Sequence, residues 1–252
     1  MYSCFMSRLK AVIAALVKGM GVNAAARPTG ASKPTVLMVL ARFGCACAAY
    51  HYDHVRGLRP ARVACDEIRS FVYCKEKNDR IAKAMVCGGG DCYTWIAVDR
   101  DTKLIIFDLI GKRTGGDAVT FMDDLAGRVI NLDQLTADGF NGYPDAVKAA
   151  FGNEVNYGQL IRHYNAVPTG PETRYSLASC VGFTKQGVIG FPNPVEMSTS
   201  IVERVNLTLR IHNGLMTRLT NGHSKKQENQ GHAMALFFLS QNYCRKHKTL
   251  KG

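Results

Sequence analysis

Three acidic residues occupy positions at which a carboxylate could do chemistry. Asp66 interrupts an apolar run, ARVACDEIRS (residues 61–70), and an ionised carboxylate in a buried strand must be paired or must hold a metal. Asp138 follows a second apolar run in LTADGF, and Glu203 begins the amphipathic stretch of STSIVERVNLTLR. Clustered carboxylates suit hard divalent cations, which prefer oxygen ligands to thiolates or imidazoles. In phosphodiester transfer, two such ions about 3.5–4 Å apart stabilise the attacking and leaving oxygens.

Each of these carboxylates also has a purely structural explanation. Asp66 could end its strand, with its neighbour Glu67 facing water, and Asp138 is followed by glycine as in an ordinary turn. Glu203 lies three residues after a serine, which is the spacing of a capping box. Yet Glu203, Asn206 and Arg210 recur on one side of a predicted helix. That polar stripe suits a metal-and-phosphate site, and it also suits a solvated helix face.

The chain is strongly basic, and its charge is concentrated at the two ends. The formal net charge is +12 over 252 residues. Lys and Arg exceed Asp and Glu by eight in residues 1–62 and by seven in residues 201–252, whereas residues 63–200 have an acidic excess of three. Basic segments attract polyanions, nucleic acid foremost, although an anionic membrane surface or solubility alone would also explain them. An acidic centre between basic ends suits phosphodiester chemistry better.

Neither the cysteines nor the N-terminus points to secretion. The nine cysteines include no CxxC pair and have no disulfide-type spacing, which is typical of reduced thiols in a cytosolic protein. The apolar run at residues 11–17 is at the lower limit for a signal peptide and far too short to span a membrane. We therefore expect a soluble helix there and no membrane partner.

Hydrophobic periodicity divides the chain into two regions. Residues 1–46 predict a helix at 7–19, a short helix and glycine turn at 23–30 and a helix at 32–40, which is the outline of a helix-turn-helix. Small helical bundles look the same, and Pro28 is unexpected inside the short middle helix. A polar linker at residues 47–61 follows. Residues 62–252 have the order of an RNase H-like α/β fold, with a Gly-, Pro- and Ser-rich insertion at 166–197. The predicted strands there are 63–65, 71–74, 93–99, 103–110 and 132–136, with 93–99 and 103–110 as an antiparallel pair, and the predicted helices are 118–129, 144–151, 198–212 and 224–246.

Seven stretches carry a more specific signal. They are CAAYHYDHVRG (47–57), CDEIRSFVYCKEKN (65–78), FMDDL (121–125), LTADG (135–139), STSIVERVNLTLR (198–210), TRLTNGHSKKQEN (217–229) and HKTL (247–250). Together they resemble an insertion-sequence transposase of the Asp-Asp-Glu class, in particular the bacterial insertion-sequence-one group. The chain departs from that group at Arg69, where Trp is usual, and at Phe140, where His is usual. Glycines also replace larger residues at positions 214, 222 and 231.

The resemblance implies an RNase H-like catalytic core with Asp66, Asp138 and Glu203 as catalytic residues and metal ligands. The implied cofactor is Mg²⁺, for which Mn²⁺ can substitute. It further implies that a small all-α helix-turn-helix domain reads the ends of the element. The implied partners are double-stranded DNA, as terminal inverted repeats and target, and a second copy of the chain on that DNA, in the bacterial cytoplasm at the nucleoid. The residues expected to contact DNA are Lys33, Thr35, Arg42, Arg204, Asn206, Arg210, Lys225 and Lys226.

Two functions of different class therefore stay open at this point. The first is a transposase that cleaves DNA at the element ends and transfers the strands to a target. The second is a catalytically decayed DNA-binding relic that occupies or represses those ends. The complete acidic set favours the enzyme, whereas Pro28 and the three glycines favour the relic. A nuclease that cleaves but never joins is a third, weaker possibility.

Overall fold

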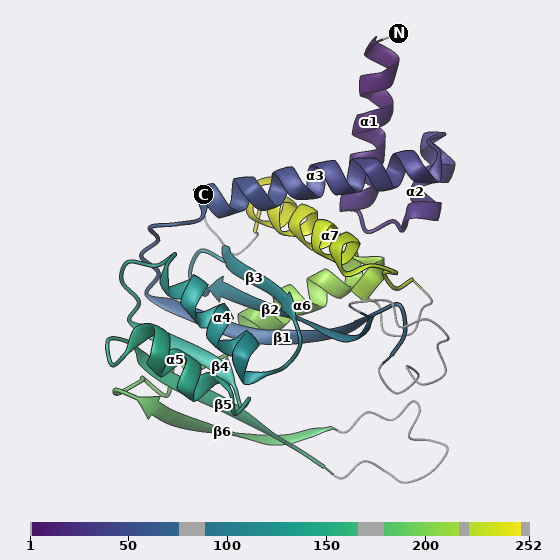
Figure 1. Cartoon of the computed structure of the whole chain (residues 1–252). Helices are drawn as coiled ribbons and strands as arrows, with labels where there is room; N and C mark the ends of the chain where they lie inside the picture. Colours follow the sequence, from purple (N-terminus) through teal and green to yellow (C-terminus); the bar gives the residue numbers. More distant parts are fainter. Residues whose placement is uncertain (1, 76–88, 166–178, 217–221, 248–252) are drawn as a thin grey trace.

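A computed structural model describes residues 2–75, 89–165, 179–216 and 222–247 of the chain (Figure 1). Its elements are α1 (Tyr2–Val17), α2 (Val22–Thr29), α3 (Lys33–His54), β1 (Arg62–Val72), β2 (Gly90–Asp99), β3 (Ile105–Gly111), α4 (Gly115–Ala126), β4 (Gln134–Asp138), α5 (Tyr143–Phe151), β5 (Asn156–Tyr164), β6 (Cys180–Ile189), α6 (Ser200–His212), a 3₁₀ turn η3 (Gly214–Met216), α7 (Gln227–Leu239) and a π-helical turn η4 (Ser240–Cys244). The expected α/β class is confirmed.

One mixed sheet of six strands organises the described residues. Its strand order is β3-β2-β1-β4-β5-β6. The first three strands pair antiparallel, which confirms the predicted pairing of residues 93–99 with 103–110. β4 lies parallel to β1, β5 lies parallel to β4, and β6 closes the other edge antiparallel to β5. Because β1 and β4 are parallel neighbours, their carboxyl ends lie at the same edge of the sheet.

Two parts of the predicted sheet are wrong: the prediction divides one strand in two and places a loop where another strand lies. The strands expected at 63–65 and 71–74 are a single strand, β1, which pairs with β2 from Val63 to Val72. Asp66 and Glu67 do not end β1. The backbone hydrogen bonds of a strand do not involve its side chains, so the strand continues where the charged side chains find partners on the two faces of the sheet. The loop expected at 166–197 contains β6, and its portion at 166–178 lies outside the described residues. β6 is exposed along most of its length, so it lacks the apolar alternation that reveals a half-buried strand.

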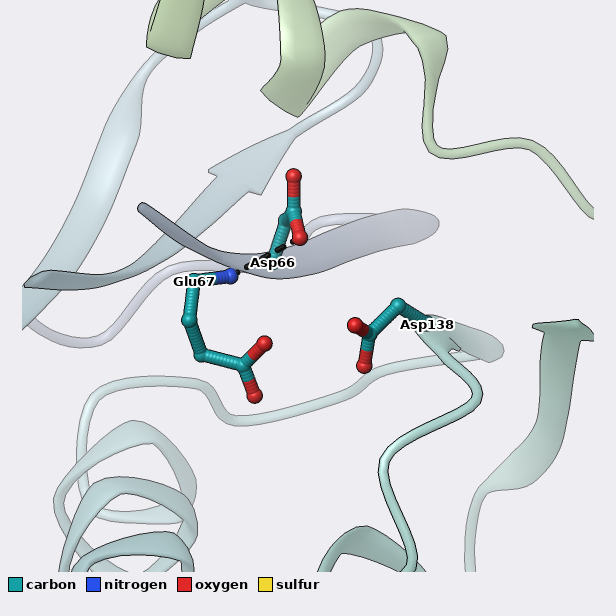
Figure 2. Close-up of side chains that lie close together, drawn as sticks. All are labelled: Asp66, Glu67 and Asp138. Atoms are coloured by element: carbon teal, nitrogen blue, oxygen red, sulfur yellow. Dashed lines mark hydrogen bonds between the residues drawn. The ribbon is translucent and has the colours of Figure 1, made fainter. Parts of the chain in front are cut away.

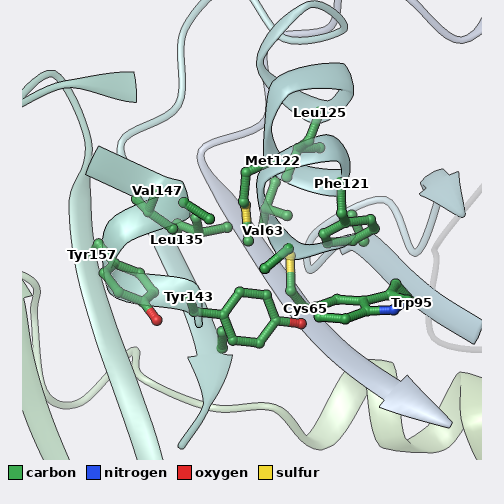
Figure 3. Close-up of a cluster of buried hydrophobic side chains, with 14 of the residues drawn as sticks. Val63, Cys65, Trp95, Phe121, Met122, Leu125, Leu135, Tyr143, Val147 and Tyr157 are labelled. Atoms are coloured by element: carbon green, nitrogen blue, oxygen red, sulfur yellow. The ribbon is translucent and has the colours of Figure 1, made fainter. Parts of the chain in front are cut away.

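Successive side chains of β1 enter two different hydrophobic cores. Val63 and Cys65 face the core beneath α4 and α5, where the Trp95 ring meets Tyr143 in a T-shaped contact and Phe121 at an angle of 43° (Figure 3). Ala64 and Ile68 face the second core, beneath α6 and α7. Strand side chains alternate between faces. Asp66 therefore projects toward α6, whereas the next residue, Glu67, projects toward α4 and α5.

The N-terminal helices have a small core of their own. Val12, Ala25 and Val36 are buried where α1, α2 and α3 meet. α2 ends at Gly30, which takes a left-handed conformation with φ of 62°, and the Ser32 hydroxyl caps α3 by accepting a hydrogen bond from the Thr35 N–H at 3.3 Å. Pro28 does lie inside α2, in its last turn, where it cannot donate a backbone hydrogen bond.

The linker predicted at residues 47–61 is mostly helical, which is a correction to the sequence-based boundary. α3 continues without a break to His54, and residues 45–54 contain no proline or glycine that would end a helix. The middle of α3 packs on α7, where Leu40 and Cys47 form one buried cluster with Leu236, and Figure 1 shows α3 crossing α7. The helix expected at 224–246 is shorter. α7 begins after Lys226, and Ser224 donates to the Lys226 carbonyl at 2.6 Å instead of capping the helix.

Two mid-helix glycines are expected to respond in opposite ways to alanine. At Gly231 of α7, a Cβ atom would meet only Ile110 Cδ1 at 3.8 Å, so Gly231→Ala should stabilise the protein by about 1 kcal/mol. At Gly44 of α3, a Cβ atom would lie 2.6 Å from the backbone of His232. Gly44→Ala should therefore cost about 1–3 kcal/mol by forcing α3 and α7 apart. Thermal melts should shift upward by about 2–4 °C for the first and downward for the second. Equal shifts would contradict the close α3–α7 contact.

Candidate functional site

Three carboxylates meet at the carboxyl end of β4, beside the middle of β1. One oxygen each from Asp66, Glu67 and Asp138 lie within 4.8 Å of one another. The register pairs Ala64 with Thr136, and two residues further along both strands it brings Asp66 beside Asp138. Figure 2 shows Asp66 and Glu67 leaving β1 on opposite sides, with Asp138 facing them from the end of β4. The predicted approach of Asp66 to Asp138 is thus present.

Asp66 is held by two hydrogen bonds. Its Oδ1 accepts from the Glu67 N–H at 2.9 Å, and its Oδ2 accepts from Asn206 Nδ2 of α6 at 2.8 Å. Burial, reinforced by the negative charge of Asp138, raises the pKa of Asp66 to about 6. Asn206 was expected to contact DNA, but it is itself buried and is occupied with Asp66. Its role within the described structure is to orient that carboxylate.

Glu67 is the member of the group that sequence reasoning missed. Its side chain is 1% exposed, so the expectation that it faces water is wrong. Burial, with the charge of Asp138 as the next contribution, raises its pKa to about 8. Oε2 lies 3.5 Å from Arg113 Nη2, and Oε1 has no hydrogen-bond partner among the described residues. Had β1 been read as one long strand, the alternation with Val63 and Cys65 would have placed Glu67 inside.

Asp138 begins a turn and also faces Asp66 and Glu67. The interpretations of Asp138 as a turn residue and as a member of the acidic cluster are therefore compatible. Oδ1 accepts from the Phe140 N–H at 3.1 Å, which is the turn contact. Oδ2 accepts from Arg113 Nη2 at 2.9 Å, and that guanidinium stacks over Phe140 at 4.6 Å from the ring centroid. Arg113 comes from the loop between β3 and α4 and supplies a counter-charge to both Asp138 and Glu67.

Glu203 lies near this group without joining it. Its carboxylate forms an ion pair with Arg162 of β5 and accepts from the Thr199 hydroxyl. The capping box with the serine at 200 is wrong, because α6 begins after Thr199 and the Glu203 N–H donates to the Thr199 carbonyl at 3.0 Å. Glu203 is one helical turn before Asn206, which contacts Asp66. The third expected ligand therefore lies on the correct side of α6 but is paired with an arginine.

The donor set fits a hard divalent cation. All three converging groups offer carboxylate oxygen, the ligand type that Mg²⁺ and Mn²⁺ prefer. Glu67 Oε1 is buried with no hydrogen bond among the described residues, and such an atom gains from a cation beside it. The raised pKa values of Asp66 and Glu67 also favour a bound cation, because crowded, buried carboxylates resist ionisation without added positive charge.

The residues expected to contact DNA lie in three places. Exposed basic side chains are found on α3, on α6 and just before α7: Lys33, Arg42, Arg204, Lys225 and Lys226. Arg210 of α6 is half-buried. Thr35 is half-buried as well, and its hydroxyl lies 2.8 Å from that of Ser32 within the α3 cap. Thr35 thus has a structural role at the start of α3 that the sequence interpretation did not assign to it.

Comparisons with protein-family models and with curated proteins returned no match. Within the described ranges, no helix has both the length and the apolar character needed to cross a membrane.

Proposed function

We propose that this chain is a metal-dependent transposase of the Asp-Asp-Glu class with an RNase H-like core. The observation that carries the proposal is the placement of Asp66 and Asp138 on neighbouring parallel strands, with α6 packed beside them. The strand order β3-β2-β1-β4-β5, antiparallel in its first three strands and parallel in the last two pairings, is the topology expected of such a core. The stretches of the sequence that resemble a transposase favour that enzyme over other nucleases and transferases with a similar core.

In this proposal Asp66, Glu67 and Asp138 hold the cation, and Glu203 can join them from α6. Mg²⁺ bound there would supply activation of the attacking oxygen and stabilisation of the leaving one. The protein's own residues orient the ligands: Asn206 fixes Asp66, and the Phe140 N–H fixes Asp138. Arg113 and Arg162 give the carboxylates positive charge at the rim of the site, where a DNA phosphate would also be attracted.

The N-terminal helices support DNA binding within the same proposal. α2, the turn at Gly30 and α3 follow one another as in a helix-turn-helix, and Lys33 and Arg42 are exposed on α3. The pairing of Glu203 with Arg162 favours the second candidate, a DNA-binding relic, because it separates the third acidic residue from the other two.

One cleavage experiment separates these candidates. The purified full chain is incubated with a supercoiled plasmid that carries the inverted repeats flanking its gene, with Mg²⁺, Mn²⁺ or EDTA. Metal-dependent nicks at the repeat ends followed by joined products support the transposase. Nicks without joining indicate a nuclease, and end-specific binding without nicks indicates the relic. Absence of any preference for the repeats would contradict both DNA-end hypotheses.

Removing single charges on α3 should weaken binding to DNA ends and reduce its salt dependence. Lys33→Gln and Arg42→Gln are each expected to lower the slope of log affinity against log salt by about 0.9, the value for one phosphate contact on duplex DNA. Fluorescence anisotropy at several salt concentrations measures this slope. Lys148→Gln, on the exposed side of α5, is the matched control. Point substitutions are used because deletion of the predicted domain at residues 1–46 would cut α3 in two and uncover α7. Unchanged slopes in both variants would remove α3 from the DNA interface.

A further inference from the structure

The edge of the sheet at β3 is covered by side chains at both of its ends. At one end, Ile105 donates to Asn242 Oδ1 at 3.0 Å, and its carbonyl accepts from Asn242 Nδ2 at 2.9 Å. At the other end, the Ile110 carbonyl lies 3.5 Å from Gln227 Nε2. Exposed backbone at a sheet edge invites pairing with another chain, so such covering is a common protective device.

Between these two ends, the outward backbone groups of Asp108 are not covered by any described side chain. It lies two residues before Ile110, so its backbone N–H and carbonyl point away from β2, as the Ile110 carbonyl does. Outside the β2–β3 ladder, neither its backbone nor its carboxylate forms a hydrogen bond or ion pair with any described residue. Burial raises the pKa of its carboxyl to about 7, and the nearby Arg128 offsets this only in part.

A groove of about 500 Å³ opens in front of Asp108, between β3, α3 and α7. Figure 1 shows α3 and α7 lying across this side of the sheet. The walls are mainly small or apolar, with Ala48 from α3 and Ala235 and Phe238 from α7. The exposed Glu228 adds a second carboxylate to the lining. Sites that hold ligands typically have volumes of about 300–1,000 Å³ with apolar walls and few polar groups.

The arginine and the two histidines that line this groove already have partners. His232 Nδ1 lies 3.8 Å from Cys45 Sγ, and burial lowers the pKa of His51. Arg128 forms an ion pair with Asp124 and donates to the carbonyls of Val55 and Ile106. The His51 ring nitrogen lies 3.0 Å from the Ile105 carbonyl. Among the described residues lining the groove, the charged groups left without a partner are therefore the carboxylates of Asp108 and Glu228, beside one outward-facing peptide unit of β3, in a protein that is otherwise strongly basic.

We propose that this groove binds an extended peptide segment carrying a lysine or arginine. The segment adds one short strand to β3, pairing with the outward backbone groups of Asp108, and its cationic side chain meets the Asp108 carboxylate. The size of the groove limits the occupant to a few residues. The proposal concerns the β3 edge alone and does not depend on the transposase function, because none of its residues belongs to the Asp66 group.

The test uses the full-length chain, uniformly labelled with ¹⁵N, and acetylated, amidated valine-lysine-valine as the probe. We expect saturable amide shifts centred on Ile110 and Gly231, with a dissociation constant of about 1 mM or below. Replacing lysine by the uncharged, equally long norleucine should weaken binding by about tenfold or more, since a charge-assisted contact is lost. n-Butylamine, which has the cation without the peptide groups, should likewise bind about tenfold more weakly.

Asp108→Asn should weaken binding of the lysine peptide by about tenfold, whereas Glu154→Gln, an exposed carboxylate on the far side of the molecule from β3, should leave it unchanged. Equal affinity for the lysine and norleucine peptides would overturn the proposal, and this comparison needs no variant that must fold. So would amine binding as tight as peptide binding, which would indicate a site for small amines only. Shifts located elsewhere, or no saturation at about 10 mM peptide, would overturn it as well.

Discussion

Asp66→Asn is expected to lower metal-dependent DNA cleavage by at least about three orders of magnitude and to leave DNA affinity nearly unchanged. The substitution keeps the shape of the side chain and one acceptor oxygen, but it removes the charge that binds the cation. Metal stabilisation of a phosphodiester transition state contributes several kcal/mol, and each 1.36 kcal/mol corresponds to about tenfold in rate. The exposed basic residues proposed to contact DNA lie on other elements and are untouched. Nicking of the plasmid and anisotropy on the same DNA measure the two quantities.

The control for this prediction is Asp133→Asn, which removes an exposed carboxylate just before β4. It should leave cleavage unchanged. A thermal melt of Asp66→Asn separates loss of chemistry from loss of the fold. The raised pKa of Asp66 favours a neutral side chain above about pH 6, whereas asparagine keeps only one of the two acceptor oxygens used by the Glu67 N–H and by Asn206. Full cleavage by Asp66→Asn would exclude this residue from the mechanism.

Glu203 and Glu67 compete for the role of third ligand, and the same assay ranks them. In the structure Glu67 lies with Asp66 and Asp138, whereas Glu203 is paired with Arg162. If Glu203 joins the cation only on DNA, Glu203→Gln should abolish cleavage without altering metal binding to the free protein. If Glu67 alone is the third ligand, Glu203→Gln should keep its activity. The two outcomes distinguish a site that is complete in the free chain from one that DNA completes.

The sequence predicted the approach of Asp66 to Asp138 because both follow apolar runs, and a parallel pair of strands brings such ends together. It could not predict Glu67, since reading Asp66 as the end of a strand hides the alternation that turns the next residue inward. Arg113 and Arg162 were equally invisible: both are distant in sequence, and one comes from a loop while the other lies on β5 near the sheet edge. The length of α3 was missed because the contacts that hold its second half, such as that of His51 with the Ile105 carbonyl, exist only in the folded chain.

Glu67→Gln is expected to stabilise the metal-free protein at pH 8 and to abolish its stabilisation by Mg²⁺. An ordinary glutamate has a pKa of about 4.3, whereas burial raises that of Glu67 to about 8 in the folded chain. Below about pH 4 the carboxyl is protonated whether the chain is folded or not, so its favourable contribution is fully present. As pH rises toward about 8 the unfolded chain ionises first, and that contribution is lost, by an amount on the order of a few kcal/mol.

Glutamine stays neutral throughout, so the variant should lose less stability than the unmodified chain between pH 5 and pH 8. Magnesium reverses the order, because a cation that binds only the folded state adds about 2.7 kcal/mol at a hundredfold excess over its dissociation constant. Thermal melts of each protein at pH 5 and pH 8, with and without Mg²⁺, measure its stability under these four conditions. Glu154→Gln provides an exposed control. A variant that gains as much from Mg²⁺ as the unmodified chain would show that the cation is held without Glu67, which would leave Asp66, Asp138 and Glu203 as its ligands.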